Sequence, residues 1–262
     1  MLRPRLVCSD ADAEAGAVLT GRTAVVTGGS RGIGRAIVER LCRDGAHVVF
    51  GYATGEEAAA EVVRAVEAAG GRATAVRADL ALPDGAERLM AAADEHLDGL
   101  DVLVNNAATT YRPTPLAETG AEDFDRVLAV NLRSVFLTVR HAARVMRDGG
   151  RIVNISTVNT VRPAPGIAAY AASKGAVEQL TSIAARELGA RGITVNTVSP
   201  GATDTELLRG ANPPQALEAV AALTPLGRLG RPSDVADVVA FLVGPDGGWV
   251  TGQNIRASGG LA

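Results

Sequence analysis

TAVVTGGSRGIGRAIVERLC, residues 23–42, is the stretch of sequence that decides the fold. It opens with a short apolar run that contains two adjacent valines, continues into a turn with four glycines, and closes with a helix-forming segment. This order predicts a strand, a tight turn and a helix. A strand that leads through a glycine turn into a helix is typical of the first unit of an α/β domain that binds nucleotides.

The glycine turn, Thr27–Gly34, has the composition of an anion site. Gly28, Gly32 and Gly34 permit positive φ and leave room for a pyrophosphate at the helix amino terminus, where unpaired amide hydrogens favour anions. The spacing is GxxxGxG, which differs from the common GxGxxG pattern and lacks the GK[ST] ending of a nucleoside-triphosphate loop. A glycine-rich turn that binds nothing is the alternative interpretation.

The rest of the chain alternates β-branched runs with alanine-rich helical stretches, which predicts a doubly wound, Rossmann-type, seven-stranded parallel sheet with helices on both faces. The predicted strands are Thr23–Thr27, His47–Phe50, Ala73–Arg77, Asp101–Val104, Arg151–Ile155, Thr194–Val198 and Asn254–Arg256, and the predicted helices cover 33–44, 56–69, 84–97, 121–147, 168–189 and 233–243. A length of 262 residues with 47% hydrophobic content suits one domain, which we expect at residues 21–262. Residues 1–20 show no sustained period and are expected to form a partly disordered extension.

Composition argues against several classes of function. A net charge of -3 and a pI near 5.7 provide no basic field for nucleic acid. Cys8 and Cys42 lie in no CxxC or Cys/His spacing, so we expect no metal site and a reducing, cytoplasmic location. No apolar run reaches the roughly 18 residues of a membrane span, so no membrane association is expected.

Tyr170 and Lys174 lie four residues apart in AAYAASKGAVEQL, which places a phenol and an ammonium on the same helix face. A fixed positive charge near a phenol lowers its pKa from the ordinary value of about 10. The pair therefore predicts a tyrosine that exchanges a proton at physiological pH. Tyr and Lys also meet at this spacing by chance in many helices, so the pair needs further motifs.

Those motifs occur in the order typical of the single-domain short-chain dehydrogenase/reductase family, which the chain resembles from about Thr20 to its end. The landmarks are Thr27–Gly34 for TGxxxGIG, Asn105-Asn106-Ala107 for NNAG, Asn131 for the helical Asn, Ser156-Thr157 for the hydroxyl residue, Tyr170 with Lys174 for YxxxK, and Pro200-Gly201 for PG. One departure is Ala108, which replaces the glycine of NNAG. The resemblance implies an oxidoreductase and a homotetramer, for which Trp249 is either a subunit contact or part of the core.

The sequence favours NADP(H) over NAD as the coenzyme. NAD sites usually place a carboxylate at the end of the second strand, but Phe50–Thr54 contains no acid. Arg31, inside the glycine turn, offers a permanent cation for a 2′-phosphate, and Thr54 offers a weaker contact. A solvated loop charge is the alternative for Arg31.

The resemblance implies further coenzyme contacts. Asp79 and Leu80 match the adenine pocket, although a helix-capping role for Asp79 is the rival interpretation. Asn105 is expected to bind backbone on the nicotinamide side, and Thr205 or Thr203 to lie near the nicotinamide amide or the phosphates. The predicted coenzyme-binding residues are Gly28, Ser30, Arg31, Gly32, Ile33, Gly34, Thr54, Asp79, Leu80, Asn105, Ala107, Tyr170, Lys174, Pro200, Gly201, Thr203 and Thr205.

The resemblance also implies the catalytic set, which is Asn131, Thr157, Tyr170 and Lys174. The catalytic hydroxyl is expected thirteen positions before the tyrosine, which is Thr157. Ser156 is the alternative, but at an extended strand end it points to the opposite side of the backbone. Lys174 is expected to bind the nicotinamide ribose and Asn131 to hold a water near the lysine.

The expected reaction is NADP(H)-dependent reduction of a ketone, such as a 3-oxoacyl or polyketide carbonyl, with Tyr170 as the proton donor. Substrate choice is expected to depend on 202–228, a long segment with prolines that covers the site as a lid. The alternative function is a catalytically weak NADP(H)-binding regulatory or sensor protein of the same fold.

Overall fold

The computed structural model describes residues 17–262, which form a seven-stranded parallel sheet in the order β3-β2-β1-β4-β5-β6-β7. The strands are β1 Thr23–Val26, β2 His47–Tyr52, β3 Arg72–Arg77, β4 Leu100–Asn105, β5 Met146–Ile155, β6 Thr194–Pro200 and β7 Asn254–Ala257. The helices are α1 Gly32–Arg43, α2 Glu56–Ala68, α3 Gly85–His96, α4 Ala121–Leu128, α5 Ser134–Val145, α6 Ala168–Leu188, α7 Glu206–Ala211, α8 Pro214–Leu223 and α9 Pro232–Val243. The predicted doubly wound fold is confirmed.

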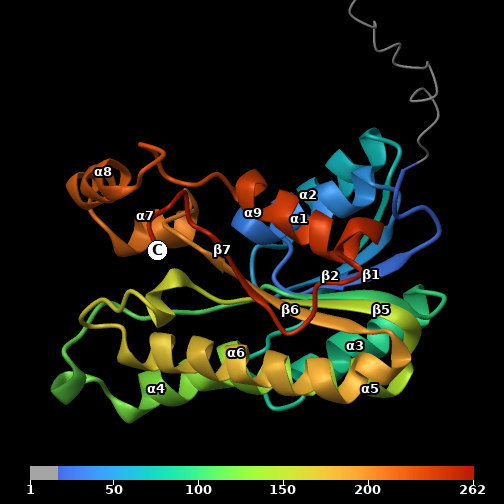
Figure 1. Cartoon of the computed structure of the whole chain (residues 1–262), viewed down its shortest axis with the longest axis horizontal. Helices are drawn as coiled ribbons and strands as arrows, with labels where there is room; N and C mark the ends of the chain where they lie inside the picture. The colour runs from blue at the N-terminus through green and yellow to red at the C-terminus, as the bar shows by residue number, and fades with distance from the viewer. Residues whose placement is uncertain (1–16) are drawn as a thin grey trace, which may run out of the picture.

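The helices cover both faces of the sheet (Figure 1). Helices α1, α2 and α9 lie on one face, around a core that includes Ile37, Val62 and Val239. Helices α3, α5 and α6 lie on the other face, around a core that includes Met90 and Val177. Two-sided coverage explains why the central strands are continuous apolar runs rather than alternating ones, since parallel strands bury both faces.

The strand order reverses between β1 and β4, and this switch point determines where a ligand can lie. After β1 the chain builds β2 and β3 on one side, and β4 then pairs with β1 on the other side. Ligands of open parallel sheets bind in the crevice beyond the carboxyl ends of the strands at such a point. The glycine turn follows β1 and Asn105 ends β4, so both lie at this crevice.

The prediction of one continuous helix over 121–147 is wrong. The segment is divided into α4, a π-helical turn at Ala129–Arg133 and α5, and the chain is already extended at Met146, which pairs with Leu100. A π turn inserts one extra residue into a helix without interrupting its apolar face, so periodicity alone does not reveal it. Seven of the fourteen ends of the predicted strands differ from the observed ones by one or two residues, six coincide, and the start of β5 differs by five.

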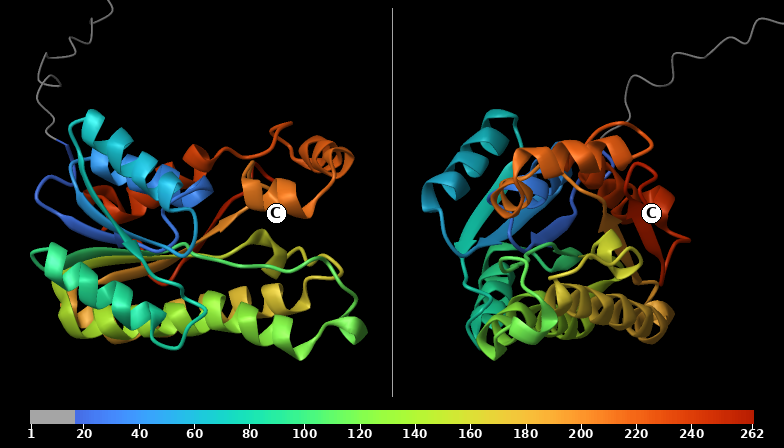
Figure 2. Two further views of the ribbon diagram at one scale, coloured as in Figure 1. Left: turned by 180° about the vertical axis from the view of Figure 1, so that it is seen from behind. Right: turned by 90° about the vertical axis from the view of Figure 1, so that its left-hand side faces the viewer.

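The predicted lid, 202–228, contains two helices that the sequence reading left unassigned, α7 and α8 (Figure 2). Thr205 caps α7, because its Oγ1 accepts a hydrogen bond from Leu208 N at 3.2 Å, and Pro214 opens α8. The two ends of the segment are joined by a bridge between Thr203 and Gly230. The segment is therefore a compact excursion from the end of β6 rather than an open loop.

The predicted extension, residues 1–20, lies outside the described residues up to position 16, and so does Cys8. Residues 17–20 belong to the fold instead. Leu19 is buried in the core, and its amide donates to the carbonyl of Asp44 at 2.7 Å. Within the described range no helix combines the length and hydropathy that crossing a bilayer requires.

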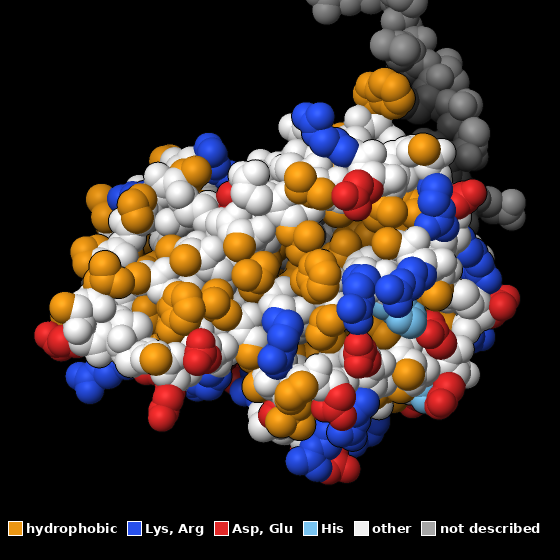
Figure 3. Space-filling view, turned by 90° about the horizontal axis from the view of Figure 1, so that it is seen from below, with side chains coloured by type: hydrophobic (Ala, Val, Ile, Leu, Met, Phe, Trp, Pro, Cys, Tyr) orange, Lys and Arg blue, Asp and Glu red, His pale blue; other side chains and the backbone are white. Residues whose placement is uncertain are grey.

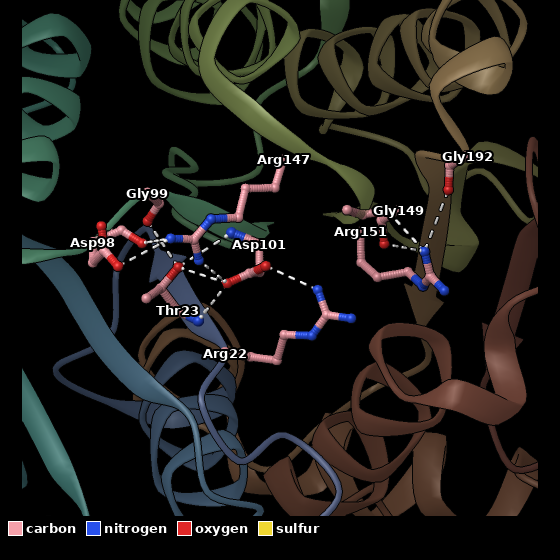
Figure 4. Close-up of polar contacts among 10 residues, drawn as sticks. Arg22, Thr23, Asp98, Gly99, Asp101, Arg147, Gly149, Arg151 and Gly192 are labelled. Atoms are coloured by element: carbon pink, nitrogen blue, oxygen red, sulfur yellow. Dashed lines mark hydrogen bonds and ion pairs between the residues drawn. The ribbon is translucent and has the colours of Figure 1, made fainter.

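A buried carboxylate joins three strands at the amino-terminal edge of the sheet, opposite the crevice (Figure 4). Asp101 is only 2% exposed and accepts hydrogen bonds from Arg22 Nη1 at 2.8 Å, Thr23 N at 2.9 Å and Arg147 Nη1 at 3.1 Å. Burial alone would raise the pKa of Asp101, but the Thr23 and Arg22 hydrogen bonds and the charge of Arg147 lower it below its usual value. The ionised carboxylate therefore holds β1, β4 and the start of β5 together.

We predict that Asp101→Asn lowers the free energy of unfolding by about 1–3 kcal/mol at pH 7, since it weakens charge-assisted hydrogen bonds. Because the folded-state pKa is depressed, the stabilisation is complete above the unfolded pKa of about 3.9 and is lost as the pH falls through the folded value. Urea unfolding at pH 7 and in acid measures this. Asp98→Asn, at an exposed carboxylate that also pairs with Arg147, is the control and should change little. A deficit of equal size in acid would contradict the role of the ionised form.

Candidate active site

The glycine turn between β1 and α1 is shaped by positions where a side chain would not fit. Gly28 and Gly32 have φ values of +68° and +53°, and every residue of positive φ in the described chain is glycine. A Cβ on Gly34 would lie 2.0 Å from the carbonyl oxygen of Gly28. Gly29, which the sequence reading did not single out, packs against Phe50, where a Cβ would lie 2.6 Å from that of the phenylalanine.

This turn leaves the amino terminus of α1 available to an anion. No side chain of the described residues caps this helix, and its first turn contains no acid. Ser30 is buried within the turn, while Ile33 packs against the core beneath α1. The first amide hydrogens of α1 therefore keep their capacity to bind a pyrophosphate.

The two asparagines after β4 have different partners. Asn106, not Asn105, binds the backbone of the turn, since its Nδ2 donates to the carbonyls of Thr27 and Gly28, both at 3.0 Å. Asn105 faces the interior, where its Nδ2 donates to Asn154 Oδ1 at 2.9 Å. The structure thus corrects the predicted backbone-binding role of Asn105 and assigns that contact to its neighbour.

Ala107 and Ala108 complete this edge. Ala107 N donates to Thr27 Oγ1 at 2.9 Å, and the Cα of Ala107 lies where a Cβ on Gly28 would approach it to 2.9 Å. Ala108 stands where the related motif has glycine, but its φ is not positive, so its methyl group imposes no backbone strain. The alanine at position 108 therefore fits a backbone conformation that any L-residue can adopt.

The end of β2 presents a cation and a hydroxyl instead of a carboxylate. Arg31 Nη2 donates to Thr54 Oγ1 at 3.2 Å, so residues from the glycine turn and from the loop after β2 meet. Arg31 is about half exposed and also pairs with Glu206 of α7 at 3.4 Å. This arrangement suits a phosphate on the ribose better than a free 2′-hydroxyl.

The remaining predicted coenzyme contacts surround the same crevice. Asp79 does not cap α3, because its Oδ1 accepts from Ala81 N at 2.9 Å in the preceding loop, and Leu80 is buried beside it. Pro200 ends β6, and Gly201 lies against Ser258, where a Cβ would come within 2.9 Å of the serine Cα. Thr203 is buried and bonded to the Gly201 carbonyl at 3.1 Å. Thr205, in contrast, lies against Gly32 of the turn.

Lys174 is the most buried charged group of the site, at 2% exposure. Its Nζ donates to the carbonyl oxygen of Ile155 at 2.7 Å and lies 6.0 Å from the centre of the Tyr170 ring. Burial lowers the pKa of Lys174 to about 8. The ammonium is therefore still mostly protonated at pH 7 but titrates close to the physiological range.

The pKa of Tyr170 is shifted in the direction opposite to the one predicted from the spacing. Burial raises the pKa of the phenol, and a hydrogen bond with Thr157 only partly opposes this rise. The loss of water around the phenol therefore decides the direction of the shift in the protein alone. Tyr170 is thus protonated at neutral pH.

The structure brings Thr157, and not Ser156, to Tyr170. Thr157 follows β5 in extended conformation, where its Oγ1 accepts from Asn159 N at 3.3 Å, and its hydroxyl is the side-chain group that lowers the pKa of Tyr170 against the rise from burial. Ser156 points to the other side of the chain, where its Oγ donates to Glu178 Oε1 at 2.7 Å. Adjacent residues at a strand end face opposite sides, which is the reason for this division.

Asn131 lies in the π-helical turn between α4 and α5 and is fully buried. Its Oδ1 accepts from Thr109 N at 2.8 Å, and its Nδ2 donates to Ser173 Oγ at 3.2 Å. Ser173 in turn donates to the Tyr170 carbonyl at 2.7 Å. Asn131 therefore connects the loop after β4 to α6 next to Lys174, and π turns are common at functional sites.

Tyr111 is a further residue that the sequence reading missed. It is buried in the loop after β4, and its hydroxyl accepts a hydrogen bond from Ala169 N, at the start of α6, at 3.2 Å. This contact satisfies a free amide of the first turn, next to Tyr170. A lone tyrosine in a loop carries no sequence signal for such a role.

The fold and this crevice define a Rossmann-type α/β protein with an anion-binding turn beside a half-buried tyrosine and a buried lysine. In the part of the chain that the structure describes, no group of three or more His, Cys, Asp or Glu side chains is placed to hold a metal. The sequence profile described as enoyl-(acyl carrier protein) reductase matches residues 28–262. The chain belongs to the short-chain dehydrogenase/reductase family.

Similar proteins match over nearly their whole length. An uncharacterized oxidoreductase of Methylorubrum extorquens is 44% identical over 245 residues, which cover 93% of this chain and 98% of the relative. The structure of a short-chain dehydrogenase/reductase from Serratia marcescens is 43% identical, with a TM-score of 0.88 over 93% of this chain and 99% of the other. The angucycline C-6 ketoreductase with bound NADP is 45% identical, with a TM-score of 0.89 over 93% and 96%.

Proposed function

We propose that this protein is an NADP(H)-dependent oxidoreductase that reduces a ketone to a secondary alcohol. The observation that carries the proposal is the meeting of the Tyr170 phenol and the Thr157 hydroxyl beside the buried Lys174, at the edge of the sheet that also holds the glycine turn. An NADP-bound ketoreductase of similar sequence and structure supports the same class of reaction.

Different residues of the crevice fit the different parts of NADPH. The uncapped amino terminus of α1 suits the pyrophosphate, and the pair Arg31 and Thr54 suits the 2′-phosphate. Lys174 has ammonium protons beyond the one donated to Ile155, so we infer that it binds the nicotinamide ribose while it keeps that contact. When bound, NADPH supplies the hydride for the carbonyl carbon.

The residues of the site supply the proton and orient the substrate. Thr157 and Tyr170 hold the carbonyl oxygen between two hydroxyls. The O–H bond of Tyr170 breaks as the new O–H bond to the substrate oxygen forms, and the phenol carries this proton at neutral pH. The positive charge of Lys174 stabilises the phenolate that remains.

The lid supports a hydrophobic substrate. Leu207, Leu223 and Leu226 of the excursion are 49%, 63% and 68% exposed, although leucine usually lies inside a fold. An apolar lining around one carbonyl suits a polyketide or a 3-oxoacyl chain. The excursion leaves the end of β6, next to the proposed coenzyme site, so it is in place to cover both ligands.

We propose that the protein forms a homotetramer through the layer that contains helices α4, α5 and α6. Hydrophobic side chains gather across the middle of this face (Figure 3). Helices α4, α5 and α6 also expose Phe124, Phe136 and Ile183, each at least 43% exposed. Trp249 is 98% exposed, which makes the core-packing alternative for this residue wrong. Light scattering should give about four times the chain mass of 26.7 kDa, and a monomer would contradict the proposal.

Substitution of the neighbouring hydroxyls tests the reaction. Tyr170→Phe and Thr157→Val should each lower the turnover number for ketones by about 10²- to 10⁴-fold, because each removes a hydroxyl from the carbonyl oxygen. Ser156→Ala should lower it by less than about tenfold, because this serine contacts Glu178 instead. The readout is NADPH consumption with a panel of aliphatic, aromatic and 3-oxoacyl ketones.

NADPH binding by each variant is the control, since an intact coenzyme site shows that the fold survives. A Tyr170→Phe variant with wild-type turnover would refute the mechanism. A larger loss for Ser156→Ala than for Thr157→Val would instead refute the assignment of the hydroxyl.

A further inference from the structure

Helix α7 of the lid rests on the glycine turn at two adjacent points. A Cβ on Gly32 would lie 3.2 Å from the methyl group of Thr205, so the backbone of the turn and the cap of α7 are in close contact. The next residue, Glu206, places its Oε2 3.4 Å from Nη1 of Arg31. The lid and the turn therefore share both an apolar contact and an ion pair.

The two terminal nitrogens of the Arg31 guanidinium contact two different segments of the chain. Its Nη2 faces Thr54, at the end of β2, where the 2′-phosphate of NADPH is proposed to bind. Its Nη1 faces Glu206. A phosphate that binds the end of the Arg31 guanidinium in a bidentate way uses both of these nitrogens.

We infer that Glu206 is a specificity-determining residue that competes with the 2′-phosphate of the coenzyme for Arg31, so that binding of the phosphate breaks the ion pair between α7 and the glycine turn. The inference rests on the proposed NADP(H) dependence. Glu206 lies outside the proposed reaction centre and acts only through the cation that it shares.

Charge and exposure determine whether the 2′-phosphate or the Glu206 carboxylate pairs with Arg31. A phosphate monoester carries about 1.5 to 2 negative charges at pH 7, whereas the carboxylate carries one. The Arg31–Glu206 pair is weak, because its side chains are 52% and 77% exposed and water screens them. The phosphate therefore displaces Glu206, but the 2′-hydroxyl of NADH does not. Helix α7 therefore loses its ion pair with the glycine turn in the NADPH complex and keeps it in the NADH complex.

Calorimetric titration of the full chain with NADPH and with NADH tests the competition. Glu206→Gln should lower the Kd for NADPH by about 1.5- to fivefold, the range that an exposed ion pair contributes, and leave the Kd for NADH unchanged. Glu218→Gln is the matched control, since it removes the same charge from an exposed position on α8 of the same lid. It should leave both constants unchanged.

A second arm separates competition for Arg31 from repulsion at a distance. In an Arg31→Ala background the Glu206→Gln substitution should no longer tighten NADPH binding, because no shared cation remains. An equal gain with and without Arg31, or equal effects of Glu206→Gln and Glu218→Gln, would overturn the inference. A wild-type protein that binds NADH more tightly than NADPH would instead overturn the proposed coenzyme.

Discussion

The hydrogen bond from the buried Lys174 ammonium to the Ile155 carbonyl is the interaction on which the site depends. It ties α6 to the end of β5, and these two elements carry Tyr170 and Thr157. A protonated amine without water must find an oxygen acceptor, so α6 cannot slide along the sheet without leaving this charge unpaired. The position of the phenol relative to the hydroxyl follows from that constraint, together with the Tyr111 hydroxyl at the start of the same helix.

The two edges of the sheet have different tasks for one topological reason. All strands are parallel, so their carboxyl ends gather the turns that carry the glycines, Arg31 and Thr157 at one edge. The amino-terminal edge holds Asp101 with its arginine partners and contributes to stability instead. The lid belongs to the first edge, and the pair between Arg31 and Glu206 connects its position to the glycine turn. Coenzyme choice and access to the substrate are thus proposed to share one cation.

The sequence could predict features that depend on local pattern. The seven strands and the glycine turn were predicted because apolar runs and glycine spacing directly reflect backbone needs. The proximity of Thr157 to Tyr170 was predicted by counting residues, although its catalytic role stays a prediction. The π turn around Asn131 and the helices of the lid were missed, because packing rather than periodicity decides them. The raised pKa of Tyr170 was also missed, because it reflects burial that spacing cannot report.

The central claim is that Tyr170 holds its proton at neutral pH in the protein alone, with a pKa that its own burial raises. The most direct measurement is a titration of tyrosinate ultraviolet absorbance, in which the signal of Tyr170→Phe is subtracted from that of the wild-type protein. The account predicts that the Tyr170 signal in the protein alone appears only above the ordinary tyrosine pKa of about 10. A signal that appears near pH 7 would contradict it.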